Sequence, residues 1–244
     1  MAETICETSI RIMQQILEEG AAALGCSLTP QQTAAFGRFG RLLLEKNRVM
    51  NLTAITDPAD VARLHFLDCL TLLQLTEFPG KTVIDVGCGA GFPGIPLLLA
   101  EPSIRLTLLD SLTKRTDWLR TVLPQLPAEA EVLTGRAEEA VAGRREQYEI
   151  AVSRAVARLP VLCELCLPWV RPGGLFLAMK GEQAEAEAAE AAGAVARLGG
   201  QLEEIAACRI PGTEIVHRTV VIRKVSPTPP QYPRRYAKIR QNPL

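Results

Sequence analysis

Glycines are concentrated in one short stretch, which reads TVIDVGCGAGFPG from Thr82 to Gly94 and carries the strongest chemical signal in the chain. Glycine adopts positive φ readily and allows backbone N–H groups to approach a ligand closely. The spacing of Gly89, Gly91 and Gly94 satisfies the dinucleotide pattern G-x-G-x-x-G, in which a strand enters a tight turn and a helix follows. The stretch therefore predicts a nucleotide-type site, and this pattern alone leaves a nicotinamide- or flavin-dependent oxidoreductase open.

Two acidic residues narrow the class of ligand. Asp85 lies two residues before Gly87, where a carboxylate repels a pyrophosphate but can accept hydrogen bonds, directly or through water, from a cationic aminocarboxylate. Asp110 ends the next apolar stretch, Leu106-Thr-Leu-Leu, at the position where a ribose diol would lie. Dinucleotide-binding folds share this second acid, so Asp85 is the residue that distinguishes the two classes.

Several further motifs occur along the chain. They are Asn51-Leu-Thr-Ala-Ile, His65-Phe-Leu-Asp68, Gly91-Phe-Pro-Gly-Ile-Pro-Leu, Gly135-Arg-Ala-Glu138, Val152-Ser-Arg154-Ala-Val-Ala, Trp169-Val-Arg-Pro-Gly-Gly, Lys180-Gly181 and the terminal Asn242-Pro-Leu. With the glycine turn, they make the chain resemble the S-adenosylmethionine-dependent methyltransferases of class I. More narrowly, it resembles the family of ribosomal RNA small subunit methyltransferase G, also called glucose-inhibited division protein B. The resemblance extends from about Gln31 to the C-terminus.

The resemblance implies a doubly wound α/β fold, with a mostly parallel, seven-stranded, Rossmann-like sheet and an N-terminal helical subdomain. It implies methyl transfer from S-adenosyl-L-methionine to N7 of one guanosine, with 16S rRNA or an assembly intermediate of the small ribosomal subunit as partner. Guanine N7 keeps an in-plane lone pair at neutral pH, so no general base is needed and catalysis rests on alignment and charge. The alternatives are an NAD(P)-dependent oxidoreductase and a non-catalytic, methyltransferase-like RNA-binding assembly factor.

The resemblance also implies the site residues. The family's cofactor contacts would fall on Gly87 and Phe92 in the glycine turn, on Ala137 and Glu138 at the adenine end, and on Arg154. Gly89 and Asp110, the latter at the ribose, complete the expected cofactor-binding residues. Arg154 would lie near the methionine end of the cofactor and the guanine, as the catalytic residue. Two features depart from the family pattern: Cys88 stands where a small hydroxyl residue is common, and the basic tail lacks a glycine and a proline between its cations.

Two pairs of residues have structural interpretations that we favour. His65 and Asp68 are spaced i, i+3 on one helix face, and a His–Asp hydrogen bond that fixes the helix to the sheet is expected there rather than a catalytic pair. Cys163 and Cys166 match C-x-x-C within an apolar helical stretch. Because no further zinc ligands lie nearby in the sequence, we expect core thiols and no metal.

The arginines near the expected methyl site also have a structural interpretation. Arg154 and Arg158 could pair with Glu138 and Glu164, in which case neither would act on a substrate. His217 lies before a predicted strand and carries no signal of its own.

The elements that must position these residues change type at about residue 70. Up to there, apolar spacing predicts helices: one from Ile5 to Leu17, one over residues 31–47 opened by Pro30, and one that begins at Asp57-Pro58. Beyond it, short runs that are apolar throughout alternate with helical stretches, which is typical of a parallel sheet covered on both faces. The predicted strands are Thr82–Val86, Arg105–Leu109, Glu131–Leu133, Glu149–Ser153, Leu175–Met179 and Arg218–Val225, and Glu182–Leu198 is predicted as a surface helix. We divide the chain into a helical portion (1–70), a methyltransferase domain (71–225) and a basic tail (226–244).

The composition agrees with a globular protein. Of 244 residues, 48% are hydrophobic and 22% are charged, which excludes wholesale disorder and fibrous classes. No apolar run approaches the length of a membrane span, the N-terminus lacks a secretory pattern, and seven cysteines without a regular framework suit a reducing cytosol. We therefore expect a cytoplasmic monomer without membrane or metal partners.

A net charge of zero hides a basic end. From Arg209 to Leu244 there are eight basic residues and one acid, a net charge of +7, so the rest of the chain carries −7. The predicted RNA-binding residues within this end are Arg234, Arg235, Lys238 and Arg240. Tyr232 and Tyr236 are interleaved with them, a mixture that suits single-stranded or looped RNA. The alternative is a structural tail that docks on the body through Ile239 and Leu244.

Overall fold

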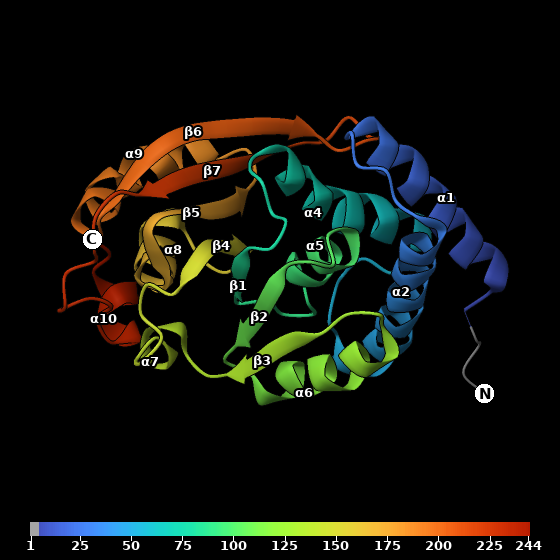
Figure 1. Cartoon of the computed structure of the whole chain (residues 1–244), viewed down its shortest axis with the longest axis horizontal. Coiled ribbons are helices and arrows are strands. Elements are labelled where there is room, and N and C mark those ends of the chain that lie inside the picture. Colours follow the sequence, from blue (N-terminus) through green and yellow to red (C-terminus); the bar gives the residue numbers. More distant parts are fainter. Residues whose placement is uncertain (1–4) are drawn as a thin grey trace.

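A computed structural model describes residues 5–244 and shows one sheet between two layers of helices (Figure 1). The strand order is β3-β2-β1-β4-β5-β7-β6. Strands β1 to β5 run parallel, and β7 pairs antiparallel with both β5 and β6. The strands are β1 (Thr82–Val86), β2 (Arg105–Asp110), β3 (Ala130–Thr134), β4 (Tyr148–Arg154), β5 (Val170–Lys180), β6 (Gly200–Arg209) and β7 (Val216–Lys224).

Helices precede the sheet and connect its strands. The α-helices are α1 (Glu7–Ala23), α2 (Pro30–Met50), α3 (Pro58–Asp60), α4 (Asp68–Leu70), α5 (Gly94–Ala100), α6 (Thr113–Val122), α7 (Ala137–Ala140), α8 (Leu159–Cys166), α9 (Ala184–Arg197) and α10 (Tyr236–Gln241). A π-helix covers Val61–Leu67, and 3₁₀ turns cover Thr71–Gln74, Leu123–Gln125 and Leu167–Trp169. Within residues 5–244, no helix is both long enough and apolar enough to cross a membrane.

The doubly wound, mostly parallel sheet predicted from the sequence is confirmed. The predicted helix starts are confirmed too: Thr29 forms a capping box with Gln32 at the start of α2, and the Asp57 carboxylate accepts N–H bonds at the start of α3. Strand β6 was not predicted. It is an edge strand whose residues are mostly exposed and include acids, so it lacks the apolar run that marks the other strands.

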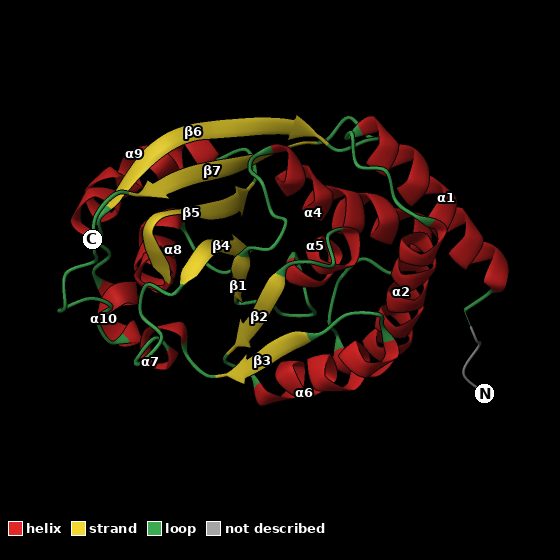
Figure 2. Cartoon of the chain, in the orientation of Figure 1, coloured by secondary structure: helices red, strands yellow, loops and turns green. Residues whose placement is uncertain are grey.

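Different helices cover the two faces of the sheet (Figure 2). Helices α1, α2, α4, α5 and α6 lie on one face, and α7, α8, α9 and α10 lie on the other. Buried residues of α1 and α2, among them Leu17 and Phe36, belong to the same hydrophobic cluster as Val83 of β1 and Ile95 of α5. The N-terminal helices are therefore built onto the sheet through a shared core.

Four parallel strands bring the predicted site residues to one edge of the sheet. Gly87 follows β1, Asp110 ends β2, Ala137 follows β3, and Arg154 ends β4. Because the carboxyl ends of parallel strands share an edge, these residues lie along one edge of the sheet, which is the usual binding location in open α/β sheets.

Candidate functional site

The glycine turn after β1 has a backbone conformation that other residues could adopt only with strain. Gly87, Gly89 and Gly91 all have positive φ, at 77°, 57° and 109°. A Cβ added at Gly87 would lie 2.4 Å from a methyl group of Val156, in the loop after β4. The N–H groups of Gly87 and Cys88 donate to the carbonyl of Leu109, at 2.8 and 3.0 Å, which ties the turn to β2. Glycine is required here for conformation and for close approach.

Asp85 places a buried carboxylate beneath this turn. The side chain is fully buried, and its Oδ2 accepts a hydrogen bond of 2.8 Å from the N–H of Gly94. Its Oδ1 has no hydrogen-bond partner among the described residues. Burial raises the pKa of Asp85 to about 7. A buried acceptor without a donor is costly, so this oxygen fits a ligand that brings a cationic donor.

Asp110 is also buried, but its oxygens are engaged by the turn around it. Oδ2 accepts from the N–H of Gly89 at 3.0 Å and lies 3.3 Å from a guanidinium nitrogen of Arg115. Oδ1 accepts from the N–H of Leu112 at 2.8 Å. The carboxylate therefore braces the glycine turn from β2, at the strand end where the ribose contact was predicted.

Ala137 and Glu138 begin α7 beside the tail. Burial raises the pKa of Glu138. The neighbouring Arg136 lies over the ring of Tyr236, with its guanidinium carbon 5.0 Å from the ring centroid. The predicted adenine end of the site thus adjoins helix α10.

Arg154 is the centre of a network that links β4 to the N-terminal helices. Its Nη1 donates to Asp68 Oδ2 at 3.1 Å and to the carbonyl of Leu64 at 3.3 Å. Its Nη2 lies 3.0 Å from His65 Nδ1, and its guanidinium carbon lies 4.9 Å from the ring centroid of Phe92. The predicted alternative pairing of Arg154 with Glu138 is wrong, because Asp68 neutralises this guanidinium instead.

The predicted contact between His65 and Asp68 is also wrong in its partners. His65 stacks on Phe92, with ring centroids 4.5 Å apart, and its Nε2 lies 2.7 Å from Thr53 Oγ1. The partner of Asp68 is His217 of β7, at 2.7 Å from Nδ1 to Oδ1. Burial lowers the pKa of His65 to about 3, whereas the hydrogen bond with Asp68 raises the pKa of His217. Nothing in the sequence indicates this role for His217, because it lies 149 residues from Asp68.

The basic tail docks on the body. Arg234 forms a salt bridge of 2.6 Å with Glu164 of α8, whose side chain is fully buried, and Ile239 is fully buried as well. The predicted alternative pairing of Arg158 with Glu164 is wrong, because Arg158 pairs with Glu190. Three other cations of the tail are exposed and form no ion pair among the described residues: Arg235, Lys238 and Arg240.

The thiols of Cys163 and Cys166 are buried, and burial raises the pKa of both. They belong to the hydrophobic core between α8 and the sheet. Within residues 5–244, no three His, Cys, Asp or Glu side chains are grouped so that they could hold a metal ion.

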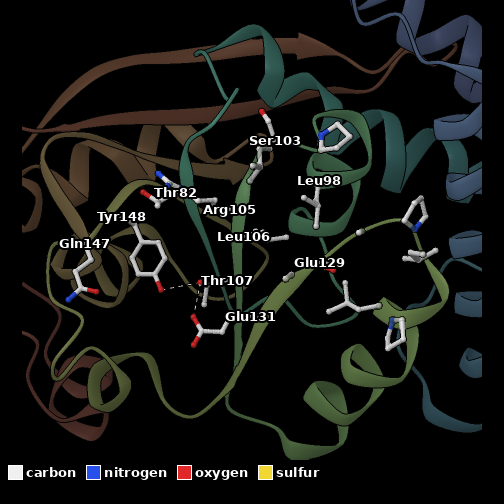
Figure 3. Close-up of a pocket in the computed structure, with 18 of the residues that line it drawn as sticks. Thr82, Leu98, Ser103, Arg105, Leu106, Thr107, Glu129, Glu131, Gln147 and Tyr148 are labelled. Atoms are coloured by element: carbon white, nitrogen blue, oxygen red, sulfur yellow. Dashed lines mark hydrogen bonds between the residues drawn. The ribbon is translucent and has the colours of Figure 1, made fainter.

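A cleft of about 1150 Å³ lies at the opposite edge of the sheet (Figure 3). Its lining includes Thr82, Arg105 and Tyr148, which begin β1, β2 and β4. Its central polar groups bond with one another, since the Tyr148 hydroxyl donates to Thr107 Oγ1, which in turn donates to Glu131. None of the predicted site residues lines it, so size alone does not locate the site.

The chain is similar in sequence to a known family and to proteins that carry the name of that family. The family described as rRNA small subunit methyltransferase G matches residues 32–216. A protein named "Ribosomal RNA small subunit methyltransferase G" from Pelotomaculum thermopropionicum is 44% identical over 237 residues, which cover 96% of this chain and 99% of that protein. A protein of the same name from Alkaliphilus oremlandii is 43% identical and covers 95% of this chain and 99% of its own length.

Solved structures support the fold alone, because their sequence identities are low. A methyltransferase in complex with the Trm112 activator of Haloferax volcanii has a TM-score of 0.56 and 14% identity, covering 75% of this chain and 98% of that chain. The precorrin-6y C5,15-methyltransferase of Geobacter metallireducens has a TM-score of 0.52 and 13% identity, covering 72% and 92%. The resemblance seen in the sequence is confirmed, and the oxidoreductase alternative is not favoured. By its sequence, over most of its length, this chain belongs to the rRNA small subunit methyltransferase G family.

Proposed function

We propose that this protein transfers the methyl group of S-adenosyl-L-methionine to N7 of one guanosine in 16S rRNA. One observation supports the proposal beyond family membership: within residues 5–244 the buried Oδ1 of Asp85 has no donor, and it precedes a turn in which Gly87, Gly89 and Gly91 have positive φ. A cationic aminocarboxylate supplies the missing donor, whereas the pyrophosphate of a dinucleotide would meet a negative charge there. A 16S rRNA substrate would place the protein in the cytoplasm. We propose that it acts there as a monomer.

The cofactor-binding residues of this proposal are those on the shared strand edge: Gly87, Gly89, Phe92, Asp110, Ala137, Glu138 and Arg154. Bound S-adenosylmethionine supplies an electrophilic methyl group on a sulfonium. Asp85 would accept a hydrogen bond from the amino group, and the turn would present its backbone to the cofactor. Asp110 holds that turn in place through the N–H of Gly89, so its effect on binding includes preorganisation.

Arg154 is the residue that we assign to the reaction itself. Guanine N7 attacks with its own lone pair, so the protein must align the base and handle charge rather than remove a proton. Arg154 suits this role, because its side chain is only 17% exposed and its guanidinium is held by Asp68 and His65. His65 is neutral near pH 7 and serves here as a hydrogen-bonding partner rather than as a charge.

The tail would bind rRNA through its exposed cations, Arg235, Lys238 and Arg240. Arg234 was predicted with them as an RNA contact, but Glu164 engages its guanidinium through Nε and Nη2. We therefore assign Arg234 to the anchoring of the tail. The docking of the tail beside α7 would hold the three exposed cations close to the adenine end of the cofactor site.

Methyl incorporation into 16S rRNA or small subunits tests the proposal. Treatment with borohydride and aniline cleaves RNA at N7-methylguanosine, and we expect it to cleave the methylated 16S rRNA at a single position. Binding of S-adenosylhomocysteine without binding of NAD is expected in calorimetry. Absence of methyl incorporation, with RNA binding intact, would point to a non-catalytic assembly factor, and tight NAD binding would point to an oxidoreductase.

Arg154→Ala tests the assignment of the catalytic residue. We expect methylation to fall by at least about tenfold, near 1.4 kcal/mol of transition-state stabilisation, while cofactor affinity changes less than twofold. Arg197→Ala is the matched control, since Arg197 is exposed at the end of α9 and away from the site edge. Unchanged turnover in Arg154→Ala would assign this arginine to structure.

Substitution of the three exposed tail cations by alanine tests the RNA contacts. Each lost phosphate contact removes roughly 0.7 to 0.9 from the slope of log affinity against log salt, so the triple variant should lose about 2 to 3. This variant keeps Arg234 and Ile239, and therefore the docking of the tail, which deletion of residues 232–244 would remove. An unchanged slope with full rRNA methylation would leave the tail with a structural role only.

A further inference from the structure

The guanidinium of Arg154 has donors left over. It carries five N–H bonds and can only donate. Nη1 uses both of its bonds, on Asp68 and on the carbonyl of Leu64, and Nη2 uses one on His65. The Nε–H and one N–H of Nη2 have no acceptor among the described residues. These two open donors belong to a side chain that the surrounding contacts hold in one orientation.

The contact with His65 fixes the hydrogen-bond pattern of the imidazole. Since Arg154 must donate, Nδ1 of His65 must carry the lone pair. The ring is then neutral with its proton on Nε2, which donates to Thr53 Oγ1 at 2.7 Å. That oxygen also accepts from the N–H of Ile55, so the hydroxyl group is anchored by its own loop. The low pKa of His65, about 3, agrees with a ring that stays neutral.

Asp68 holds the opposite side of the guanidinium. Its side chain is 2% exposed, and its two oxygens are shared between Arg154 at 3.1 Å and His217 Nδ1 at 2.7 Å. His217 donates from β7, where Cys208 of β6 lies opposite it in the register. Residues 64–68 thus hold the guanidinium above the ring of Phe92, and His217, far away in the chain, holds Asp68.

We propose that His65, Asp68 and His217 are positioning residues that aim the two open N–H bonds of Arg154 at O6 of the target guanine. This inference rests on the proposed function. Guanine presents O6, an acceptor, directly beside N7, whereas adenine presents an N6 amino donor at the same place. Donors aimed at O6 would accept guanine and reject adenine, and they would leave the N7 lone pair free to attack. Arg154 is then the residue that selects the base.

A site built to satisfy a substrate acceptor penalises analogues that lack it, because its own donors are left unpaired. RNA in which 2-aminopurine replaces the target guanosine keeps N7 and lacks O6, and is therefore the required probe. We expect wild-type methylation of this RNA to be at least tenfold slower. The intrinsic reactivity of N7 differs between the two bases, but it cancels when variants are compared with the wild type on each RNA.

Asp68→Asn is the principal variant. On guanosine RNA we expect kcat to fall at least tenfold, with affinity for S-adenosylhomocysteine within twofold. On 2-aminopurine RNA, the same variant should differ from the wild type by no more than about twofold, because the contact that Asp68 supports is already absent. A purely structural role would lower methylation of both RNAs by the same factor.

His217 supplies a second pair of variants that spares the buried carboxylate. His217→Asn keeps a donor toward Asp68, so its kcat on guanosine RNA should stay within about threefold of the wild-type value. His217→Leu should lower kcat several-fold more than His217→Asn, and on guanosine RNA only. Equal losses on both RNAs, or a His217→Asn variant no better than His217→Leu, would overturn the inference. A wild type that does not methylate guanosine RNA at all would instead overturn the proposed function.

Discussion

The salt bridge between Glu164 and Arg234 is the contact that we expect to matter most for docking of the tail. Glu164 is fully buried in α8, and Arg234 is 13% exposed. The carboxylate accepts from the backbone N–H of Arg234 at 2.7 Å, from Nε at 2.9 and 3.1 Å, and from Nη2 at 2.6 Å. Removal of one partner of a buried pair costs about 3–5 kcal/mol, because the other charge is left without compensation.

Arg234→Ala should therefore lower the free energy of unfolding by about 3 kcal/mol. We choose the lower end because the backbone N–H of residue 234 can still donate to Glu164. Urea denaturation measures the loss, with an unchanged m-value as the sign of two-state unfolding. Arg235→Ala is the matched control and should change the free energy of unfolding by less than about 0.5 kcal/mol, since Arg235 is exposed and forms no ion pair among residues 5–244.

A double variant separates the charge from the packing. Glu164→Leu with Arg234→Met replaces both partners by apolar groups of similar volume, which is often neutral or stabilising. We expect it to recover most of the stability lost in Arg234→Ala. A loss below 1 kcal/mol in Arg234→Ala, or a double variant less stable than Arg234→Ala, would refute the reasoning that an uncompensated charge is the cause.

Three further predictions follow from local geometry and from pKa shifts. Gly87→Ala should weaken binding of S-adenosylhomocysteine more than tenfold in calorimetry, since the added Cβ would lie 2.4 Å from a methyl group of Val156. Gly80→Ala is the control: Gly80 also has a positive φ, of 71°, but the space around it is open, so this variant should retain the affinity for S-adenosylhomocysteine. The pKa of His217 is raised above 6.5, so its contribution to stability is present at lower pH and is lost as pH rises through the folded-state value. Above pH 6.5, the free energy of unfolding should therefore decrease less steeply with pH in His217→Leu than in the wild type. A thiol reagent should modify exposed Cys6, whose pKa is lowered, in the native protein, and should reach Cys163, whose pKa burial raises to about 12, only after unfolding.

Features of the molecule that depend on local sequence were predictable. The glycine turn, the strand before it and the capped starts of α2 and α3 each depend on residues within a few positions of one another. The apolar runs revealed the parallel strands, because a strand covered on both faces needs no alternation. Strand β6 escaped this reasoning, since an exposed edge strand carries no such run.

Features that join distant segments were not predictable in the same way. The tail was known to be basic, yet nothing in its own sequence shows that Glu164 binds Arg234 and leaves the three neighbouring cations exposed. His217 is a lone histidine before a strand, and its partner Asp68 belongs to another part of the chain. The pair of Asp68 and His217 can be recognised only in the folded structure, where β7 lies against the N-terminal helices.

The error over His65 and Asp68 has a specific physical cause. Residues spaced i, i+3 lie on the same face in a regular α-helix. Residues Val61–Leu67 form a π-helix instead, whose wider turn removes that alignment, and Asp68 begins a new α-helical turn after it. His65 therefore faces Phe92 while Asp68 faces His217, and Arg154 binds both from between them. Helix irregularities of this kind occur frequently at functional sites, and this one lies where His65 and Asp68 both contact the guanidinium of Arg154.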